Sequence, residues 1–277
     1  MWEKSSSAPL VNAPPSLQAA LNLLNRNPNI QIWAGGTALP SKPADQILSL
    51  NLVDEIKKIT PWERFVDWGA GLSLNQLVLQ GKNLLPPLLL SALKTLGNYP
   101  LRNQGTLGGN LCSEPGGDLF PLLQALGAQA EFRSAKGFRW EASSQWPARG
   151  LKPLPGEILC RIRIPKETWN LTLFEKLGTH RSAGEEQVSY FVLARITRET
   201  ISALRMGIYF PSAGLLRNRA LEANLQGRKL PFTPQDKELI YKAWEEEFPF
   251  LTKPLAPFQS SRLTSITDWM IKQIREE

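Results

Sequence analysis

Two pairs of adjacent glycines, each beside a threonine, are the residues of this sequence whose types and spacing best suit chemistry. The first pair lies in segment 34–37 (AGGT) and the second in segment 106–110 (TLGGN). Glycine lets backbone N–H groups come close to a ligand and turn through positive φ, and successive exposed N–H groups form a nest that binds anions. Thr37, Thr106 and Asn110 add side-chain donors. Together the two segments could hold a diphosphate without any lysine.

Neither segment matches a widespread phosphate-binding motif. The sequence has no GxxxxGK[ST], which excludes a P-loop NTPase, and no GxGxxG after a predicted strand, which excludes the usual Rossmann fingerprint. An ordinary tight turn is the alternative for either segment taken alone, because glycine pairs commonly mark turns. Two such segments, in a chain with only 20 glycines among 277 residues, favour a binding site.

The first glycine pair follows a predicted strand, and the second lies within segment 101–118 (LRNQGTLGGNLCSEPGGD), which we interpret as a loop shaped around a ligand. Asp118 ends this loop and precedes a predicted helix. As an N-cap it would accept hydrogen bonds from the first-turn N–H groups; as a binding residue it would accept them from ribose hydroxyls. The spacing leaves both roles open. Gly116 and Gly117 are interpreted as a turn that delivers Asp118.

Few side chains are suited to acid–base, nucleophilic or metal chemistry. The single histidine, His180, argues against a zinc site or a Ser-His-Asp triad and is interpreted as a surface residue. Cys112 and Cys160 are too few to hold an iron–sulfur cluster, which usually takes four thiolates, and do not suggest a disulfide framework. Cys112 is interpreted as a small packed residue, because no histidine is near it in sequence. We expect no catalytic side chain and no metal ligand on this chain.

The hydrophobic pattern predicts the elements that position these segments. Helical periodicity indicates helices over residues 16–25 (with Ser16 as N-cap), 73–80, 85–98, 118–127, 218–226, 234–248 and 262–277. Short apolar or alternating runs indicate strands over 30–34, 46–50, 64–71, 128–134, 158–165, 171–177, 188–196 and 201–210, with a strand or strand–turn unit over 54–59.

The strand over 158–165 (ILCRIRIP) shows the clearest alternation. One face carries Ile158, Cys160, Ile162 and Ile164. Leu159 points to the opposite face with two arginines, so we expect it to be free to meet a ligand.

The order of elements predicts an α+β protein of two domains with a boundary near residues 165–170. The net charge of +7 and the pI of about 9.5 come from scattered lysines and arginines without a basic block, so we do not expect a nucleic-acid partner. No apolar run approaches the roughly 20 residues that span a bilayer, and the N-terminus lacks the pattern of a secretory signal. We therefore expect a cytoplasmic protein without a membrane partner.

The two glycine segments, WAGGTAL and LRNQGTLGGNLCSEPGGDLFPLLQALGAQAEF, resemble the two signature loops of the FAD-binding medium subunit of molybdenum hydroxylases. Xanthine dehydrogenase and carbon monoxide dehydrogenase are of this type. The similarity continues through GEILCRIRIP and LFEKLGTHRS and covers nearly the whole chain. It implies a two-part FAD-binding domain of the vanillyl-alcohol-oxidase type over 1–168, with subdomains of about 1–55 and 56–168. A small C-terminal domain of antiparallel sheet and helices would follow over 169–277.

The resemblance also implies residue roles. Residues 32–39 would wrap the FAD diphosphate with backbone N–H groups, Gly97 would lie against the cofactor, Asp118 would bind the adenosine ribose, and Leu159 would pack on the isoalloxazine. Lys176 would lie near the flavin or its phosphates, with a solvated strand lysine as the equal alternative. The complete implied cofactor set is Ile32, Trp33, Ala34, Gly35, Gly36, Thr37, Ala38, Leu39, Gly97, Thr106, Gly108, Gly109, Asn110, Asp118, Leu159 and Lys176.

By resemblance, the chain is the FAD-dependent oxidoreductase subunit of a xanthine dehydrogenase-like complex. A large subunit would hold the molybdopterin cofactor, a small subunit would hold [2Fe-2S] clusters, and FAD would pass electrons to NAD or another acceptor. The alternatives are a stand-alone FAD-dependent oxidoreductase and a cofactor-free structural subunit of the same complex.

Overall fold

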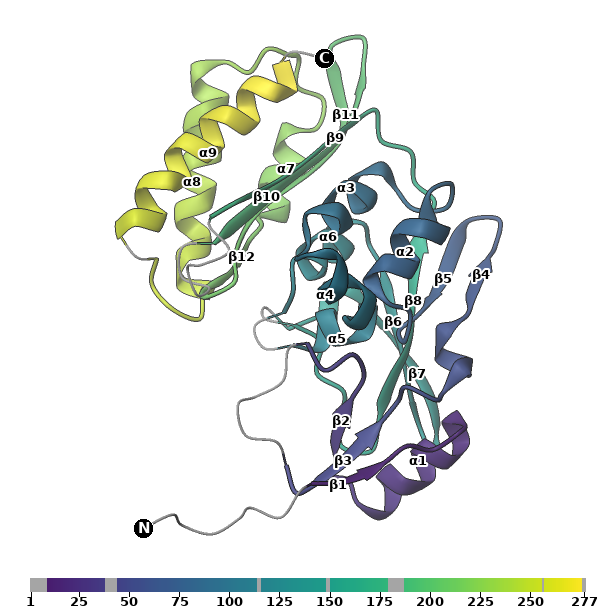
Figure 1. The fold of residues 1–277 in the computed structure, drawn as a ribbon. Helices are drawn as coiled ribbons and strands as arrows, with labels where there is room; N and C mark the ends of the chain where they lie inside the picture. Colours follow the sequence, from purple (N-terminus) through teal and green to yellow (C-terminus); the bar gives the residue numbers. More distant parts are fainter. Residues whose placement is uncertain are drawn as a thin grey trace, which may run out of the picture.

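The computed structural model describes residues 9–37, 44–113, 116–147, 150–178, 187–255 and 257–275. They form three sheets that follow one another along the chain, with helices between and around them (Figure 1). The predicted α+β class is confirmed. No helix in these ranges is long and apolar enough to cross a membrane.

The first sheet is small and parallel, in the order β1-β3-β2. Its strands are β1 (Leu10–Asn12), β2 (Gln31–Trp33) and β3 (Gln46–Ser49). Helix α1 (Leu17–Arg26) connects β1 to β2 and starts where predicted, because the Ser16 hydroxyl accepts a hydrogen bond from the Ala19 N–H at 3.2 Å. Its apolar face is buried, as the periodicity predicts. This first core also contains Ile158 and Cys160, which come from the second sheet.

The second sheet is antiparallel, in the order β4-β5-β8-β6-β7. Its strands are β4 (Ile59–Pro61), β5 (Phe65–Gly69), β6 (Gln129–Ser134), β7 (Gly137–Ala142) and β8 (Ile158–Pro165). Five helices lie on one side of it (Figure 1): α2 (Leu74–Gly81), α3 (Pro87–Thr95), α4 (Tyr99–Gln104), α5 (Leu107–Cys112) and α6 (Leu119–Ala125). Fully buried Trp68, Phe120 and Phe132 belong to the core between them.

The third sheet is antiparallel, in the order β12-β11-β10-β9, as predicted for this region. Its strands are β9 (Leu171–Leu177), β10 (Val188–Thr197), β11 (Thr200–Phe210) and β12 (Gly214–Leu216). Helices α7 (Arg219–Leu225), α8 (Pro234–Glu247) and α9 (Pro257–Arg275) lie on one side (Figure 1), while α3 and α6 approach β9 and β11. Both faces of β10 are therefore buried: Phe191 packs in the core of the second sheet and Val192 in the core of the third.

The prediction of a loop over residues 101–118 is wrong for the first part of this segment, because helices α4 and α5 occupy most of that part. Asn98 caps α4 by accepting from the Leu101 N–H at 2.9 Å, and Thr106 caps α5 by accepting from the Gly109 N–H at 3.0 Å. The glycine in α5 serves close packing: a Cβ on Gly108 would lie 3.0 Å from the Ala70 Cβ. The segment interpreted as a loop around a ligand thus consists mostly of two short capped helices, and α5 is hydrogen-bonded to the exit of β5.

The alternation predicted for 158–165 is also wrong at one end. Phe132 of β6 pairs with Leu159, whereas the preceding Glu131 pairs with Arg161, so Cys160 is the extra residue of a β-bulge. The bulge shifts the side chains before it to the other face. Leu159 consequently shares a core with Ile162, while Cys160 packs in the core of the first sheet.

Several smaller elements were predicted differently or not at all. Residues Asp54–Lys57 form a 3-10 helix instead of a strand unit, and β4 begins after it. Strands β1, β7 and β12 were not predicted. Strands β1 and β12 have only three residues each, whereas β7 alternates apolar and charged residues from Phe138 to Ala142, a signal that was overlooked. Further 3-10 turns lie at Ser143–Gln145 and Phe248–Phe250.

Candidate cofactor-binding cleft

The described residues enclose a continuous cleft between the first sheet and α5, made of adjoining hollows that share lining residues. The segment 32–37, which we call the loop wall, contributes Ile32, Ala34, Gly35, Gly36 and Thr37. The opposite side, which we call the helix wall, consists of Thr106, Gly108, Gly109, Cys112 and Ser113. The exit of β5 and the start of β8 add Ala70, Gly71, Ile158 and Leu159 to the lining, to which Pro153, Leu50 and Ile56 also contribute. The structure thus brings both predicted glycine segments to one cavity.

The loop wall has glycines for two different reasons. A Cβ on Gly35 would lie 1.8 Å from the carbonyl oxygen of Gln104, so this glycine permits contact with the end of α4. Gly36 has φ of 70°, a conformation that favours glycine. Within the described ranges, no hydrogen bond uses the N–H groups of Gly35, Gly36 or Thr37. Backbone donors without partners beside a cleft fit an anionic ligand.

The helix wall is different, because its N–H groups are already used inside the protein. The Leu107 N–H donates to the Leu72 carbonyl at 2.9 Å, the Gly108 N–H to the Ala70 carbonyl at 2.8 Å, and the Gly109 N–H to the Thr106 hydroxyl at 3.0 Å. The Thr106 hydroxyl accepts this bond and keeps its own proton to donate. From this side a ligand would therefore meet a hydroxyl and bare glycine surface. The glycines keep side chains out of the space.

Asn110 and Gly117 fix the turn that leads to Asp118. The Asn110 side-chain oxygen accepts from the Leu119 N–H at 3.4 Å, and the Gly117 N–H donates to the Asn110 carbonyl at 2.7 Å. A Cβ on Gly117 would lie 2.1 Å from the Asn110 amide, so only glycine leaves room for that side chain. The described contacts of Asn110 are thus with this turn, and its predicted contact with FAD stays a prediction.

Asp118 stands at the N-cap position of α6 but makes no side-chain capping bond. Its carboxylate instead accepts from the Lys176 ammonium of β9 at 2.6 Å. Both side chains are largely shielded, at 10% and 18% exposure. Lys176 is therefore not a solvated strand lysine, and the pair links the second sheet's helices to the third sheet. Neither residue lines the cleft described above.

The remaining predicted residues fall into three groups. Leu159 lines the cleft, through the bulge that was not predicted. Trp33 and Gly97 do not line the cleft. The indole nitrogen of Trp33 is buried and has no hydrogen-bond partner among the described residues. The Gly97 carbonyl, just after α3, accepts a hydrogen bond from the Arg102 guanidinium at 2.7 Å. Ala38 and Leu39 lie outside the described residues, as does His180.

The lining carries little charge. Among the described residues of the two walls, the Cys112 thiol is the ionisable group, and burial raises its pKa to about 12. This thiol stays protonated at neutral pH, in line with its interpretation as a packed residue. Glu157 lies at one rim, beside Pro155 and Gly156. An anion in this cleft would rely on backbone dipoles and hydroxyls instead of lysine or arginine.

Several lining residues were missed by the sequence reasoning. Cys112 and Ser113 follow Gly109 at helical spacing of three and four residues, a signal that was hidden because the segment was interpreted as a loop. The small residues Ala70 and Gly71 directly after β5 are a second usable signal, since small side chains at a strand exit leave room for a ligand.

Together the fold and the cleft define a cofactor-binding protein in which a small parallel sheet and a capped helix face one another across an apolar cavity. Residues 6–167 match the family described as FAD binding domain in molybdopterin dehydrogenase, and the chain belongs to this family. FAD is the cofactor that this domain binds.

Related proteins extend the similarity beyond that region. The chain is 26% identical over 239 residues to the glyceraldehyde dehydrogenase medium chain of Sulfolobus acidocaldarius, covering 78% of this chain and 80% of that protein. It is 29% identical over 190 residues to the carbon monoxide dehydrogenase medium chain of Afipia carboxidovorans, covering 65% and 63%. The fold is that of a chain of quinoline 2-oxidoreductase from Pseudomonas putida 86, with a TM-score of 0.81 at 20% identity over 98% of this chain and 97% of that one.

Proposed function

We propose that the chain is the electron-transfer subunit of a molybdenum-containing hydroxylase and holds FAD in the cleft between the loop wall and the helix wall. The observation that carries the proposal is the set of three backbone N–H groups, Gly35 to Thr37, which make no hydrogen bond to the part of the chain that the structure describes. They lie across the cleft from Thr106. Bound FAD supplies the redox chemistry, and the chain supplies binding, orientation and exclusion of water.

The diphosphate is assigned to the loop wall, with Thr106 donating from the opposite side. Gly108 and Gly109 give backbone surface against which the cofactor packs, and Leu159 gives an apolar contact at the strand start. Ile32 and Ala34 line the same space from β2 and the residue after it. Asp118 is assigned to the adenosine ribose and Lys176 to its positioning through the 2.6 Å ion pair. The proposed domains are 1–168 for FAD and 169–277 for the C-terminal sheet and helices.

The proposed partners are a large subunit with the molybdenum cofactor and a small subunit with [2Fe-2S] clusters, with NAD or another molecule as final acceptor. Two relatives named as medium chains of dehydrogenases support a multi-subunit assembly. The two walls carry no carboxylate, histidine, lysine or arginine among their described residues, which favours electron transfer over a stand-alone substrate site that would need an acid or base.

Purification of the full chain tests the proposal. We expect a yellow protein with a flavin absorption band, release of FAD on denaturation, and uptake of close to one FAD per chain on titration of the stripped protein. A colourless chain that takes up no FAD contradicts the proposal. Affinity purification from the native source, with molybdenum and iron analysis, tests the partners; recovery of the chain alone, with neither metal, argues for the stand-alone alternative.

A further inference from the structure

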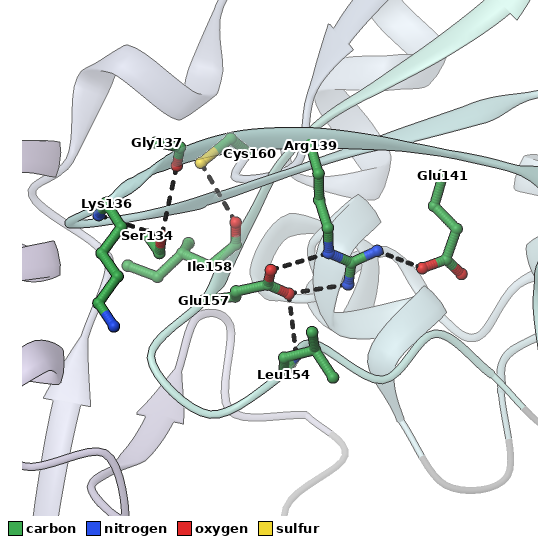
Figure 2. Close-up of polar contacts among 9 residues, drawn as sticks. All are labelled: Ser134, Lys136, Gly137, Arg139, Glu141, Leu154, Glu157, Ile158 and Cys160. Carbon is green, nitrogen blue, oxygen red and sulfur yellow. Dashed lines mark hydrogen bonds and ion pairs between the residues drawn. The ribbon is translucent and has the colours of Figure 1, made fainter.

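Arg139 of β7 makes a network of charged hydrogen bonds at the cleft rim (Figure 2). Its Nε and Nη2 donate to the two carboxylate oxygens of Glu157, both at 2.8 Å, and its Nη1 donates to Glu141. The guanidinium also lies over the Phe132 ring, 4.4 Å from the centroid. Such a bidentate pair fixes the orientation of both partners, which a lysine could not do.

Glu157 in turn holds a tight turn of the chain. Its side chain accepts from the Leu154 N–H at 2.9 Å, while its own N–H donates to the Leu154 carbonyl at 2.9 Å. The turn contains Gly156, whose φ of 86° favours glycine. Pro153, Leu154, Pro155 and Gly156 line one hollow of the cleft, together with Cys112 of the helix wall. The carboxylate thus connects a sheet residue to a turn that borders the cofactor space.

The sheet itself continues this connection to Leu159. Phe132 pairs with Arg139 on one side and with Leu159 on the other, so these three residues form one row across β7, β6 and β8. Leu159 lies two residues after Glu157 and lines the cleft. Arg139 therefore lies at one end of this row, and Leu159, which lines the cleft, lies at the other. Through Glu157, Arg139 also holds the turn that precedes Leu159.

The surroundings favour a persistent pair. The Glu157 side chain is 11% exposed and that of Arg139 is 33% exposed. Burial acts to raise the pKa of Glu157, but the hydrogen bonds from Arg139 and from the Leu154 N–H outweigh it and lower the pKa, so the carboxylate is ionised at neutral pH. The hydrogen bond to Glu157 in turn raises the pKa of Arg139, so both partners are charged at neutral pH.

We propose that Arg139 is a positioning residue for the cofactor: through Glu157 it holds the turn 154–157 and the start of β8 against the flavin. The inference rests on the proposed function, because it assigns a role toward the FAD placed there. Arg139 itself does not line the cleft, so it acts through Glu157.

The experiment measures FAD affinity of the full chain, stripped of flavin, for wild type, Arg139→Lys and Glu157→Gln. The matched control is Arg163→Lys, because Arg163 makes the same kind of bidentate pair with Asp67, at 2.7 Å and 3.0 Å, and lies over the Phe65 ring. Arg163 does not line the cleft. Calorimetric titration gives the Kd, circular dichroism of the bound flavin reports its surroundings, and amide exchange reports the Leu154 N–H.

We expect Arg139→Lys and Glu157→Gln each to raise the Kd for FAD about tenfold, which corresponds to about 1.4 kcal/mol, to alter the flavin dichroism and to speed exchange of the Leu154 amide. The double variant should bind no more weakly than either single variant, since both remove one interaction. Arg163→Lys should lower thermal stability and keep the wild-type Kd.

Two results overturn the inference while leaving the proposed function intact: wild-type affinity in both cleft-rim variants, or an equal loss in Arg163→Lys. Failure of the wild-type chain to bind FAD overturns the proposed function itself, and the inference with it.

Discussion

Replacing Gly35 by alanine should disrupt the cleft more than its single added methyl group suggests. The Cβ would lie 1.8 Å from the Gln104 carbonyl oxygen and 2.5 Å from its carbon, and both are backbone atoms that cannot rotate away. Reaching the 3.0 Å below which such contacts essentially do not occur requires a movement of about 1.2 Å. The φ of Gly35 is not positive, so the cost comes from this contact and not from backbone strain. Overpacking of this kind typically costs about 1–3 kcal/mol of stability.

The same movement separates the loop wall from the helix wall. If it removes one charge-assisted hydrogen bond to the diphosphate, worth about 1.5–3 kcal/mol, the Kd for FAD should rise at least about tenfold. Fluorescence titration of the stripped full chain measures this Kd, and thermal unfolding in the presence and absence of FAD separates folding from binding. Gly137→Ala is the control for a destabilised glycine outside the cleft: its φ of 141° strains an alanine, although a Cβ there meets no atom within 4 Å. The residue lies on the β6–β7 hairpin, so this variant should lose stability and keep the wild-type Kd. Wild-type affinity in Gly35→Ala would refute the reasoning.

Three further predictions concern contacts between the sheets and the buried thiols. Tyr209→Phe should lower the free energy of unfolding by about 1–3 kcal/mol in urea denaturation, because the fully buried Tyr209 hydroxyl donates to the Gly116 carbonyl at 2.6 Å; an unchanged value would contradict this. Asp118→Asn and Lys176→Met should each destabilise the fold by about 1–3 kcal/mol, and additive losses in the double variant would argue against a direct ion pair. Burial raises the pKa of the Cys112 and Cys160 thiols from 9.0 to about 12. Between these pH values the unfolded chain loses thiol protons that the folded chain keeps. The free energy of unfolding should therefore fall as the pH rises above about 9. Urea denaturation at pH 8 and at about pH 10.5 tests this, and Cys112→Ala/Cys160→Ala should show a smaller fall; equal slopes would mean that the thiols do not contribute.

The sequence predicted well those elements whose burial follows a regular local pattern. The start of α1 followed from Ser16 and the spacing of Leu17, Ala20, Leu21 and Leu24, all of which are buried. Strands β10 and β11 followed from long apolar runs, because both faces of the sheet are covered. These features depend on local patterns that tertiary contacts reinforce.

The errors lie where a distant contact decides the local structure. The glycines of α5 looked like loop residues, since a helix with adjacent glycines is unfavourable by itself; hydrogen bonds from Leu107 and Gly108 to the exit of β5 make it stable. The bulge at Cys160 depends on the register of β6 against β8, which alternation alone cannot specify. The ion-pair partner of Asp118 is Lys176 on β9, 58 residues later in the sequence. Helix-capping rules consider only neighbouring residues, so they could not predict this pair.

The bulge in β8 also sets a limit on how this protein can be divided. Because of it, one strand supplies Leu159 to the core of the second sheet and Ile158 and Cys160 to the core of the first. A variant without α1 and the first sheet would expose Ile158 and Cys160 to solvent. An isolated first sheet would in turn lack the part of its hydrophobic core that these two residues supply. The first and second sheets therefore form a single unit for recombination. A chimera with a relative should exchange the loop wall together with β8, and a junction near residue 56 should yield insoluble protein.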